Sequence, residues 1–149
     1  MSGGVRAVVW ILEATWEATV DAAAALLPPD AEIELLHVAF DAETFVRAGR
    51  RGLLGRHPHP PPGPDPVSTA SEEEADGLLA DAAERLGRVV TRTARRGRAE
   101  DEVLEVARDA DLLVLARGGE PDHLGPKSVG HAERFVSDHA ACAVLLVRA

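Results

Sequence analysis

Val5-Arg-Ala-Val-Val-Trp-Ile-Leu12 is a mostly apolar run without proline near the start of a 149-residue chain. Such a run is typical of a strand whose two faces are both buried. Four later segments also fit strands: 32–39, a short one over 90–94 that ends at Arg95-Arg96-Gly97, 111–116 and 143–147. Continuous apolar strands of this kind are the signature of a parallel sheet covered on both faces.

Helical patterns separate these strands. Trp16, Val20, Ala23, Ala24 and Leu27 recur on one helical face, and Pro28-Pro29-Asp30 stops that helix. Further helices are predicted over 100–108 and from Ser128 or Val129 to about residue 139.

The clearest helical stripe follows Ser71 and Glu74, which have the spacing of a capping box. The sequence therefore predicts that this helix begins at Ser71. Its apolar positions are Ala75, Leu78, Leu79, Ala82, Leu86, Val89 and Val90.

The alternation predicts an α/β fold, a doubly wound five-stranded parallel sheet that is Rossmann-like. Right-handed crossovers favour the strand order 3-2-1-4-5, which reverses between the first and fourth strands. Ligands bind where the order reverses, at the carboxyl ends of the strands. The loops 13–16 and 117–130 are therefore the candidate ligand edge.

Composition limits the classes of protein. The length predicts one domain over 1–149. A net charge of −9 and 3% aromatic residues argue against nucleic acid as a partner. We expect no membrane span and no secretory leader, and the single cysteine, Cys142, fits a reducing, cytoplasmic compartment.

Glycines in the 117–130 loop could let backbone amides cradle a phosphate at a helix N-terminus, or could simply make the loop turn. They are Gly118, Gly119, Gly125 and Gly130. Glu13, after the first strand, could hold a ribose hydroxyl or a magnesium ion, or could be a first-turn helix acid.

Other reactive side chains have simpler interpretations. His37 lies inside a strand, and we interpret it as a hydrogen-bonded core residue. We interpret Cys142 as an inert buried thiol. The spacing of the remaining histidines predicts no metal site. Arginines after the second, third and fourth strands could contact phosphate or form surface salt bridges; they are Arg47, Arg50, Arg51, Arg56, Arg95, Arg96, Arg98 and Arg117.

The segment 57–66 holds six of the ten prolines. Proline at this density predicts a mobile surface loop over about 56–70, and a polyproline ligand for a protein partner is the functional alternative.

Three segments resemble the universal stress protein family. They are the strand Glu-Leu-Leu-His37-Val38, the run from Gly97 through Ala110-Asp111-Leu-Leu-Val-Leu, and the ending His139-Ala-Ala-Cys142-Ala-Val-Leu-Leu-Val147. The resemblance covers the chain outside about 41–70. It implies an adenine-nucleotide-binding fold, a stress-associated role and a homodimer formed through the last strand.

Nucleotide-binding members of that family carry a G-x-x-G-x9-G-[S/T] loop for phosphates and an aspartate after the first strand. By this resemblance the site residues are Leu12, Glu13, Ala14, Thr15, Val38, Ala116, Arg117, Gly119, Gly130, His131 and Ala132. The chain departs from the motif at three points. Ala116 replaces the first glycine, the spacer to Gly130 is ten residues, and His131 replaces the hydroxyl residue.

These departures favour a non-enzymatic signalling or binding protein with a degenerate nucleotide site. The alternative is a competent ATP or AMP binder, with slow hydrolysis. A second alternative is a module that binds a protein partner through the proline-rich loop.

Overall fold

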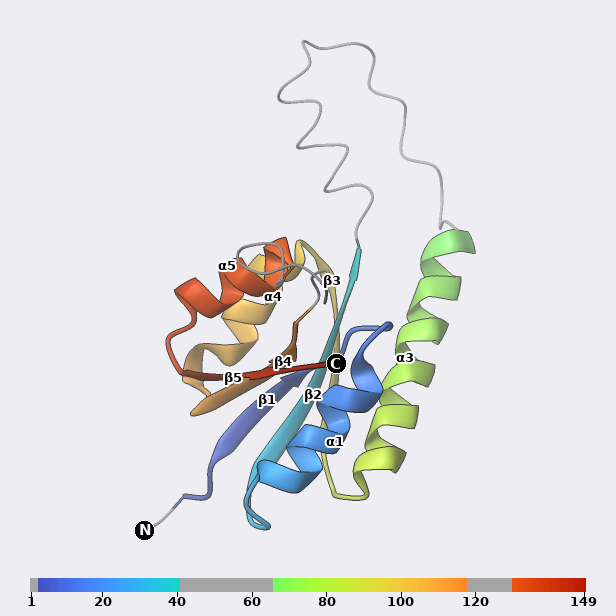
Figure 1. The fold of residues 1–149 in the computed structure, drawn as a ribbon. Helices are drawn as coiled ribbons and strands as arrows, with labels where there is room; N and C mark the ends of the chain where they lie inside the picture. Colours follow the sequence, from blue (N-terminus) through green and yellow to red (C-terminus); the bar gives the residue numbers. More distant parts are fainter. Residues whose placement is uncertain (1–2, 41–65, 118–129) are drawn as a thin grey trace.

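The computed structural model describes residues 3–40, 66–117 and 130–149. Strands and helices alternate along these ranges (Figure 1). Their bounds are β1 (Arg6–Trp10), α1 (Trp16–Leu26), β2 (Glu32–Phe40), α3 (Pro66–Leu86), β3 (Thr91–Gly97), α4 (Ala99–Val106), the 3-10 turn η1 (Ala107–Asp109), β4 (Leu112–Ala116), α5 (His131–His139) and β5 (Ala143–Val147).

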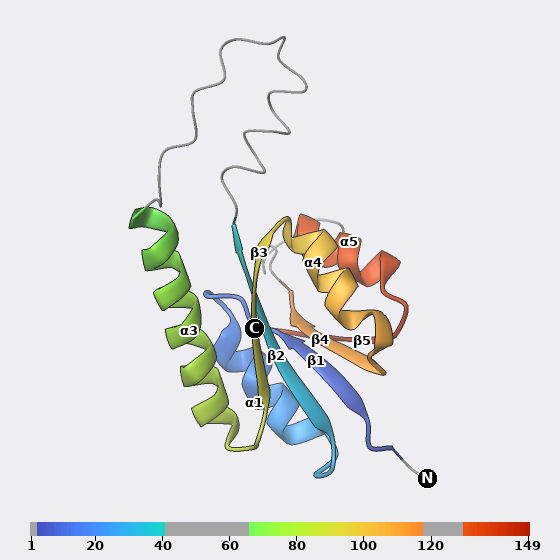
Figure 2. The same cartoon turned by 180° about the vertical axis from the view of Figure 1, so that it is seen from behind.

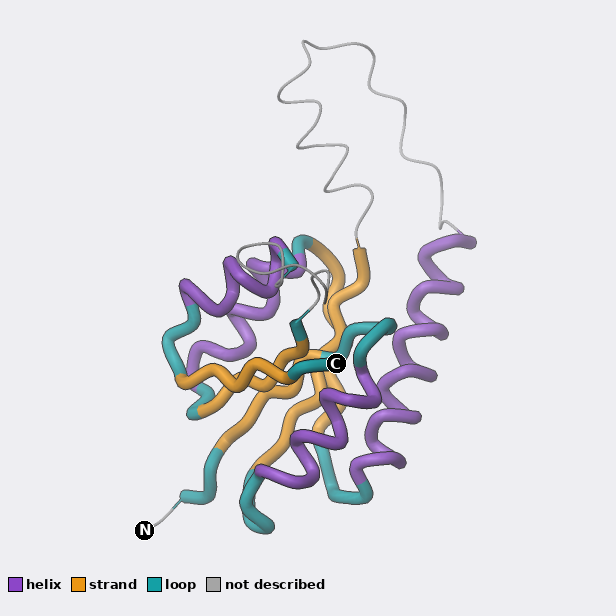
Figure 3. Tube along the Cα trace, in the orientation of Figure 1, coloured by secondary structure: helices purple, strands orange, loops and turns teal. Residues whose placement is uncertain are grey.

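The five strands form one parallel sheet in the order β3-β2-β1-β4-β5. The predicted fold class and strand order are confirmed. Val9 in the central strand pairs with Leu35 on one side and Val114 on the other. Because all strands run the same way, their carboxyl ends meet at one edge, and the order reverses between β1 and β4 (Figure 3).

Helices cover both faces of the sheet. α1 and α3 lie on one face, and α4 and α5 on the other (Figures 1 and 2). Successive strand residues point to opposite faces, so Val9 belongs to the core under α1 and α3, whereas Val8 belongs to the core under α4 and α5. Both neighbours are fully buried, which explains the continuous apolar run.

The end of α1 is joined to the turn after α3. The guanidinium of Arg88 donates hydrogen bonds to the carbonyls of Pro28 and Leu27, at 3.0 and 3.1 Å, just beyond α1, where carbonyls have no partner within the helix. α3 ends at Leu86, and the next residue, Gly87, has a φ of 69°, the left-handed conformation that favours glycine. The strand β3 follows from this turn.

Four predicted boundaries are corrected. α3 begins at Pro66, five residues before Ser71, so the predicted capping box at Ser71 and Glu74 lies inside the helix and is wrong. Proline is well suited to the first helical position, because the amide hydrogen it lacks would have no partner there. Val89 is 98% exposed beyond the end of α3, so it is not part of the helical stripe.

The other two corrections concern β3 and α5. β3 continues through the arginines to Gly97, and these residues pair with Val38, Ala39 and Phe40. α5 begins at His131, with Gly130 as its N-cap, later than the predicted start at Ser128 or Val129.

No helix within the described ranges is both long enough and apolar enough to cross a bilayer. The proline-rich segment, and with it the predicted loop and partner site, lies outside the described residues.

Candidate functional site

The end of β1 leads into a tight turn at the ligand edge. The amide of Thr15 donates to the carbonyl of Leu12 at 3.1 Å, and Thr15 is the N-cap of α1. Glu13 and Ala14 are exposed within this turn. Glu13 precedes the N-cap, so its alternative interpretation as a first-turn acid is wrong; Glu17 occupies that place.

The hydroxyl of Thr15 has an unusual environment. Its Oγ1 is buried and has no hydrogen-bond partner among the described residues, although serine and threonine N-caps usually bond an amide of the first turn. A buried hydroxyl without a partner costs free energy. The Thr15 hydroxyl is therefore a polar group at the carboxyl end of β1 that can still form a hydrogen bond.

His37 of β2 forms a side-chain hydrogen bond to the backbone at the end of β1. The imidazole Nδ1 of His37 lies 2.8 Å from the carbonyl oxygen of Ile11. A carbonyl can only accept, so Nδ1 carries the hydrogen and donates it. The predicted hydrogen bond of His37 is confirmed, although the residue is half-buried and does not lie in either core. The bond holds the neighbouring Val38, which is half-buried, beside the turn at Leu12.

The end of β4 lies next to β1 on the other side of the reversal. Ala116 is fully buried, and its side-chain methyl therefore packs inside the protein. Arg117 is exposed, and its amide donates to the carbonyl of Val147 at 2.9 Å, which extends the pairing of β4 with β5. Gly119 lies outside the described residues.

The N-terminus of α5 carries three more of the predicted site residues. Gly130 is the N-cap with φ −59°, and its carbonyl accepts from the amide of Arg134 at 2.9 Å. His131 is exposed, whereas Ala132 is half-buried and packs against the core under α4 and α5. The φ of Gly130 is open to any residue, so its conformation does not require glycine.

The space beside Gly130 is filled by the end of a side chain. A Cβ atom on Gly130 would meet the carboxylate of Glu133, a residue that is only 8% exposed, and this flexible side chain would have to move aside. Sequence reasoning did not single out Glu133. The available signal is that Gly130 and Glu133 have the N-cap to N3 spacing of a capping box, with glycine in place of serine or threonine.

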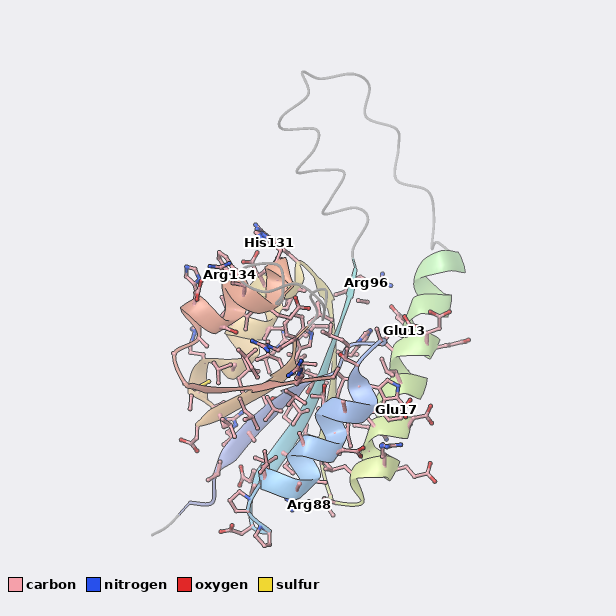
Figure 4. All side chains as sticks on the ribbon, viewed as in Figure 1. Glu13, Glu17, Arg88, Arg96, His131 and Arg134 are labelled. Atoms are coloured by element: carbon pink, nitrogen blue, oxygen red, sulfur yellow. The ribbon has the colours of Figure 1, made fainter. Side chains whose placement is uncertain are left out.

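The predicted residues fall into separate groups at this edge. The turn 12–15 and Val38 are joined through the bond between His37 and Ile11. Figure 4 shows Glu13 on the side of α3 and His131 above α5, so the structure does not bring these two side chains together.

The arginines of β3 and the residues after it form ion pairs. Arg95 lies 3.6 Å from Glu102, Arg96 lies 3.8 Å from Glu72, and Arg98 lies 2.8 Å from Glu100. These contacts support the salt-bridge interpretation of Arg95, Arg96 and Arg98. The first two arginines also line an open hollow of about 330 Å³ between β3 and α3.

Cys142 is half-buried, and burial raises the pKa of its thiol, an effect that the nearby Asp111 carboxylate adds to. A raised thiol pKa lowers the fraction of nucleophilic thiolate, which agrees with an inert cysteine. Within the described ranges, no cluster of three or more histidine, cysteine, aspartate or glutamate side chains could hold a metal ion.

Comparison with solved structures gives matches over the whole chain. The hypothetical protein MJ0577 matches with a TM-score of 0.72 and 17% identity, covering 99% of this chain and 98% of its own. A universal stress protein in complex with cAMP gives 0.67 and 16%, covering 98% of both chains. The chain has the universal stress protein fold.

A third structure with this fold is the universal stress protein from Archaeoglobus fulgidus in complex with dAMP. It matches with a TM-score of 0.64 and 15% identity, covering 98% of this chain and 99% of its own. No protein-family model and no curated protein sequence matches the chain. This chain and the matched structures therefore share the arrangement of the backbone, whereas most of their side chains differ.

Proposed function

We propose that this chain is a non-enzymatic, stress-associated signalling or binding protein with a degenerate nucleotide site at the carboxyl edge of β1, β2 and β4. The observation that carries the proposal is the N-terminus of α5, where exposed His131 follows Gly130 in place of a short hydroxyl residue. A serine or threonine hydroxyl could donate to a phosphate at this position. An imidazole is longer, and His131 points outward above α5 (Figure 4).

The proposed ligand class is supported by the ligands of solved proteins with this fold. Solved proteins with this fold are complexed with cAMP, dAMP and AMP. Here the turn 12–15 and Val38 supply the part of the edge that would hold a ribose and a base. This part includes the exposed Glu13 carboxylate and the buried Thr15 hydroxyl, which has no partner in the part of the chain that the structure describes. We therefore propose an adenosine-containing ligand whose phosphates, where present, add little affinity.

The non-enzymatic part of the proposal is supported by two side chains. The pKa of Cys142 is raised by burial, which disfavours the thiolate. His37 uses Nδ1 to hold the carbonyl of Ile11, which fixes it as a structural group. We further propose that the protein acts in the cytoplasm, where a lone thiol remains reduced.

The competing hypothesis is a competent ATP or AMP binder that uses Glu13, Val38, Gly119, Gly130 and His131, with slow hydrolysis. Calorimetric titration with adenosine, AMP and ATP, each with magnesium, separates the two. Weak adenosine binding that phosphates do not improve supports the proposal. Micromolar ATP binding with release of phosphate supports the competitor, and no heat with any of the three ligands at millimolar concentration refutes both.

We also propose a homodimer that forms through β5. This strand lies at one edge of the sheet and has no charged residue, and Leu146 is 40% exposed. An apolar edge strand is prone to pair with another chain. Replacing Leu146 with lysine should convert a dimer to a monomer in light scattering, while exposed Leu26→Lys on α1 should not. A wild-type monomer at high micromolar concentration would refute this proposal.

A further inference from the structure

The two edges of the sheet differ in charge. β5, at one edge, has no charged residue, whereas the seven residues of β3, at the other edge, include three arginines and no acid: Arg92, Arg95 and Arg96. The chain as a whole has a net charge of −9, so this positive charge is local. Figure 2 shows β3 between α3 and α4, and within the described ranges β2 is the one strand that pairs with it. An edge strand presents backbone amides and carbonyls that can pair with a further strand.

The arginines lie on both faces of this edge strand. Arg96 contacts Glu72 of α3 at 3.8 Å, and Arg95 contacts Glu102 of α4 at 3.6 Å, so the two side chains lie on opposite faces of the sheet. Because side chains alternate along a strand, Arg92 shares the α3 face with Arg96. The side chains of Arg95 and Arg96 are 43% and 37% exposed. Exposed ion pairs of this kind stabilise a protein little, so the carboxylates of a partner can compete for both arginines.

A hollow beside β3 leaves space for one more side chain. It has a volume of about 330 Å³, and its lining includes Ala94 of the strand and Ala75 of α3. Ala94 stands between Arg92 and Arg96 on this face of β3. A residue opposite Ala94 on an added strand would reach this hollow. Asp76 also lines the hollow, and its carboxylate disfavours an acid at that position.

We propose that β3 is a docking strand for an extended acidic segment of a protein partner, which pairs with its free edge and lengthens the sheet by one strand. The segment carries adjacent acids opposite Arg95 and Arg96, an apolar residue opposite Ala94 and a third acid opposite Arg92. In an antiparallel segment this pattern is Glu-Glu-Val-Thr-Glu, in which the threonine faces Thr93. Backbone hydrogen bonds supply the affinity in this mode of recognition, and the side chains supply the selectivity. The surface does not depend on the proposed nucleotide site.

A second copy of this chain fits the same edge poorly. If two β3 strands paired antiparallel about Ala94, Arg92 of each copy would face Arg96 of the other. Like charges directly opposite each other destabilise a strand pair. Charged side chains commonly protect edge strands from pairing with their own kind. The arginines of β3 therefore oppose self-association and favour an acidic partner.

The test uses the full chain and a capped peptide that carries Glu-Glu-Val-Thr-Glu with two threonines at each end. Two-dimensional NMR reports binding through the amide resonances of β3. In a second peptide each glutamate is replaced by lysine. Two further peptides are N-methylated at the odd or at the even residues. One set of amides faces β3 and the other faces solvent, so one of these two peptides should lose binding and the other should keep it.

The expected result is that the acidic peptide shifts the β3 amides and that the lysine peptide binds at least about tenfold more weakly. Arg92→Gln should weaken binding of the acidic peptide about two- to fivefold, the range of one exposed ion pair. Arg134→Gln is the matched control, since Arg134 is exposed on α5 and the change in net charge is equal. Thermal unfolding first establishes that both variants fold. Added salt should weaken binding to the wild-type protein, because the charges are exposed.

Three results overturn the inference. They are the absence of binding at millimolar acidic peptide, binding that shifts amides elsewhere but not in β3, and equal effects of the two N-methylated peptides. The first would leave the arginines only the task of protecting the edge. None of them bears on the nucleotide site, which the titration with adenosine, AMP and ATP tests separately.

Discussion

Replacing His37 with phenylalanine removes the side-chain donor that links β2 to the end of β1. Phenylalanine keeps a planar ring of similar size, so the main loss is the hydrogen bond of 2.8 Å from Nδ1 to the carbonyl of Ile11. Ile11 is fully buried. Its carbonyl therefore loses a partner in a place that water reaches poorly.

The magnitude follows from burial. A buried polar group that loses its partner costs about 1–3 kcal/mol. His37 itself is half-buried, and some water can approach it, so the lower part of that range applies, about 1–2 kcal/mol. For a chain of this length each kcal/mol lowers Tm by about 2–4 °C, which gives an expected decrease of about 2–8 °C.

Urea unfolding followed by circular dichroism measures the free energy, and a thermal scan measures Tm. His37→Asn is the matched variant, because the asparagine amide can place a donor near the position of Nδ1 and should recover part of the loss. The reasoning is refuted if His37→Phe unfolds within about 0.5 kcal/mol of the wild-type protein, the range of ordinary surface substitutions. It is also refuted if His37→Asn is the less stable of the two variants.

Two further predictions concern pH. Arg85 donates two hydrogen bonds of 2.8 Å to Asp21 and holds the pKa of that carboxyl below its usual range, so Asp21→Asn should destabilise the protein at pH 7. The difference should shrink as the pH falls through the Asp21 pKa, which urea unfolding at pH 7 and pH 3 would detect; an unchanged difference argues against the pair. Burial raises the pKa of Cys142, so its alkylation by iodoacetamide should be slower than that of a free thiol at pH 8 and should reach half its maximal rate at a higher pH than that of a free thiol. A rate at pH 8 that matches a free thiol would show that the thiol is not held in a desolvated place.

The centre of the sheet could be predicted from the sequence because β1 and β4 are buried on both faces. Val8 and Val9 point into different cores, and only apolar residues satisfy both. The edge strand β5 is largely exposed or half-buried, yet its five residues are all apolar, and the sequence predicts its observed bounds, Ala143–Val147. The sequence predicts β3 too short. β3 is an exposed edge strand, so its arginines do not show the apolar pattern by which a strand is recognised.

The helix boundaries were less predictable, for a local reason. Pro66 lies at the end of a run of prolines, and proline density argues against helix, yet a single proline at the first helical position is favourable. The capping-box spacing of Ser71 and Glu74 therefore predicts a helix start five residues too late. The proline run and the capping-box spacing predict different starts for the same helix, and the structure shows that the helix starts at the proline.

Gly130 shows why the site was harder to predict than the fold. A glycine before a helix is commonly explained by the close approach of an anion to the backbone. Its φ of −59° is open to any residue, and the atoms nearest to a Cβ there belong to the flexible end of the Glu133 side chain. Neither the conformation nor the packing of Gly130 therefore requires a phosphate beside it. For this reason the titration of AMP against adenosine, rather than the presence of Gly130, decides whether a phosphate binds at α5.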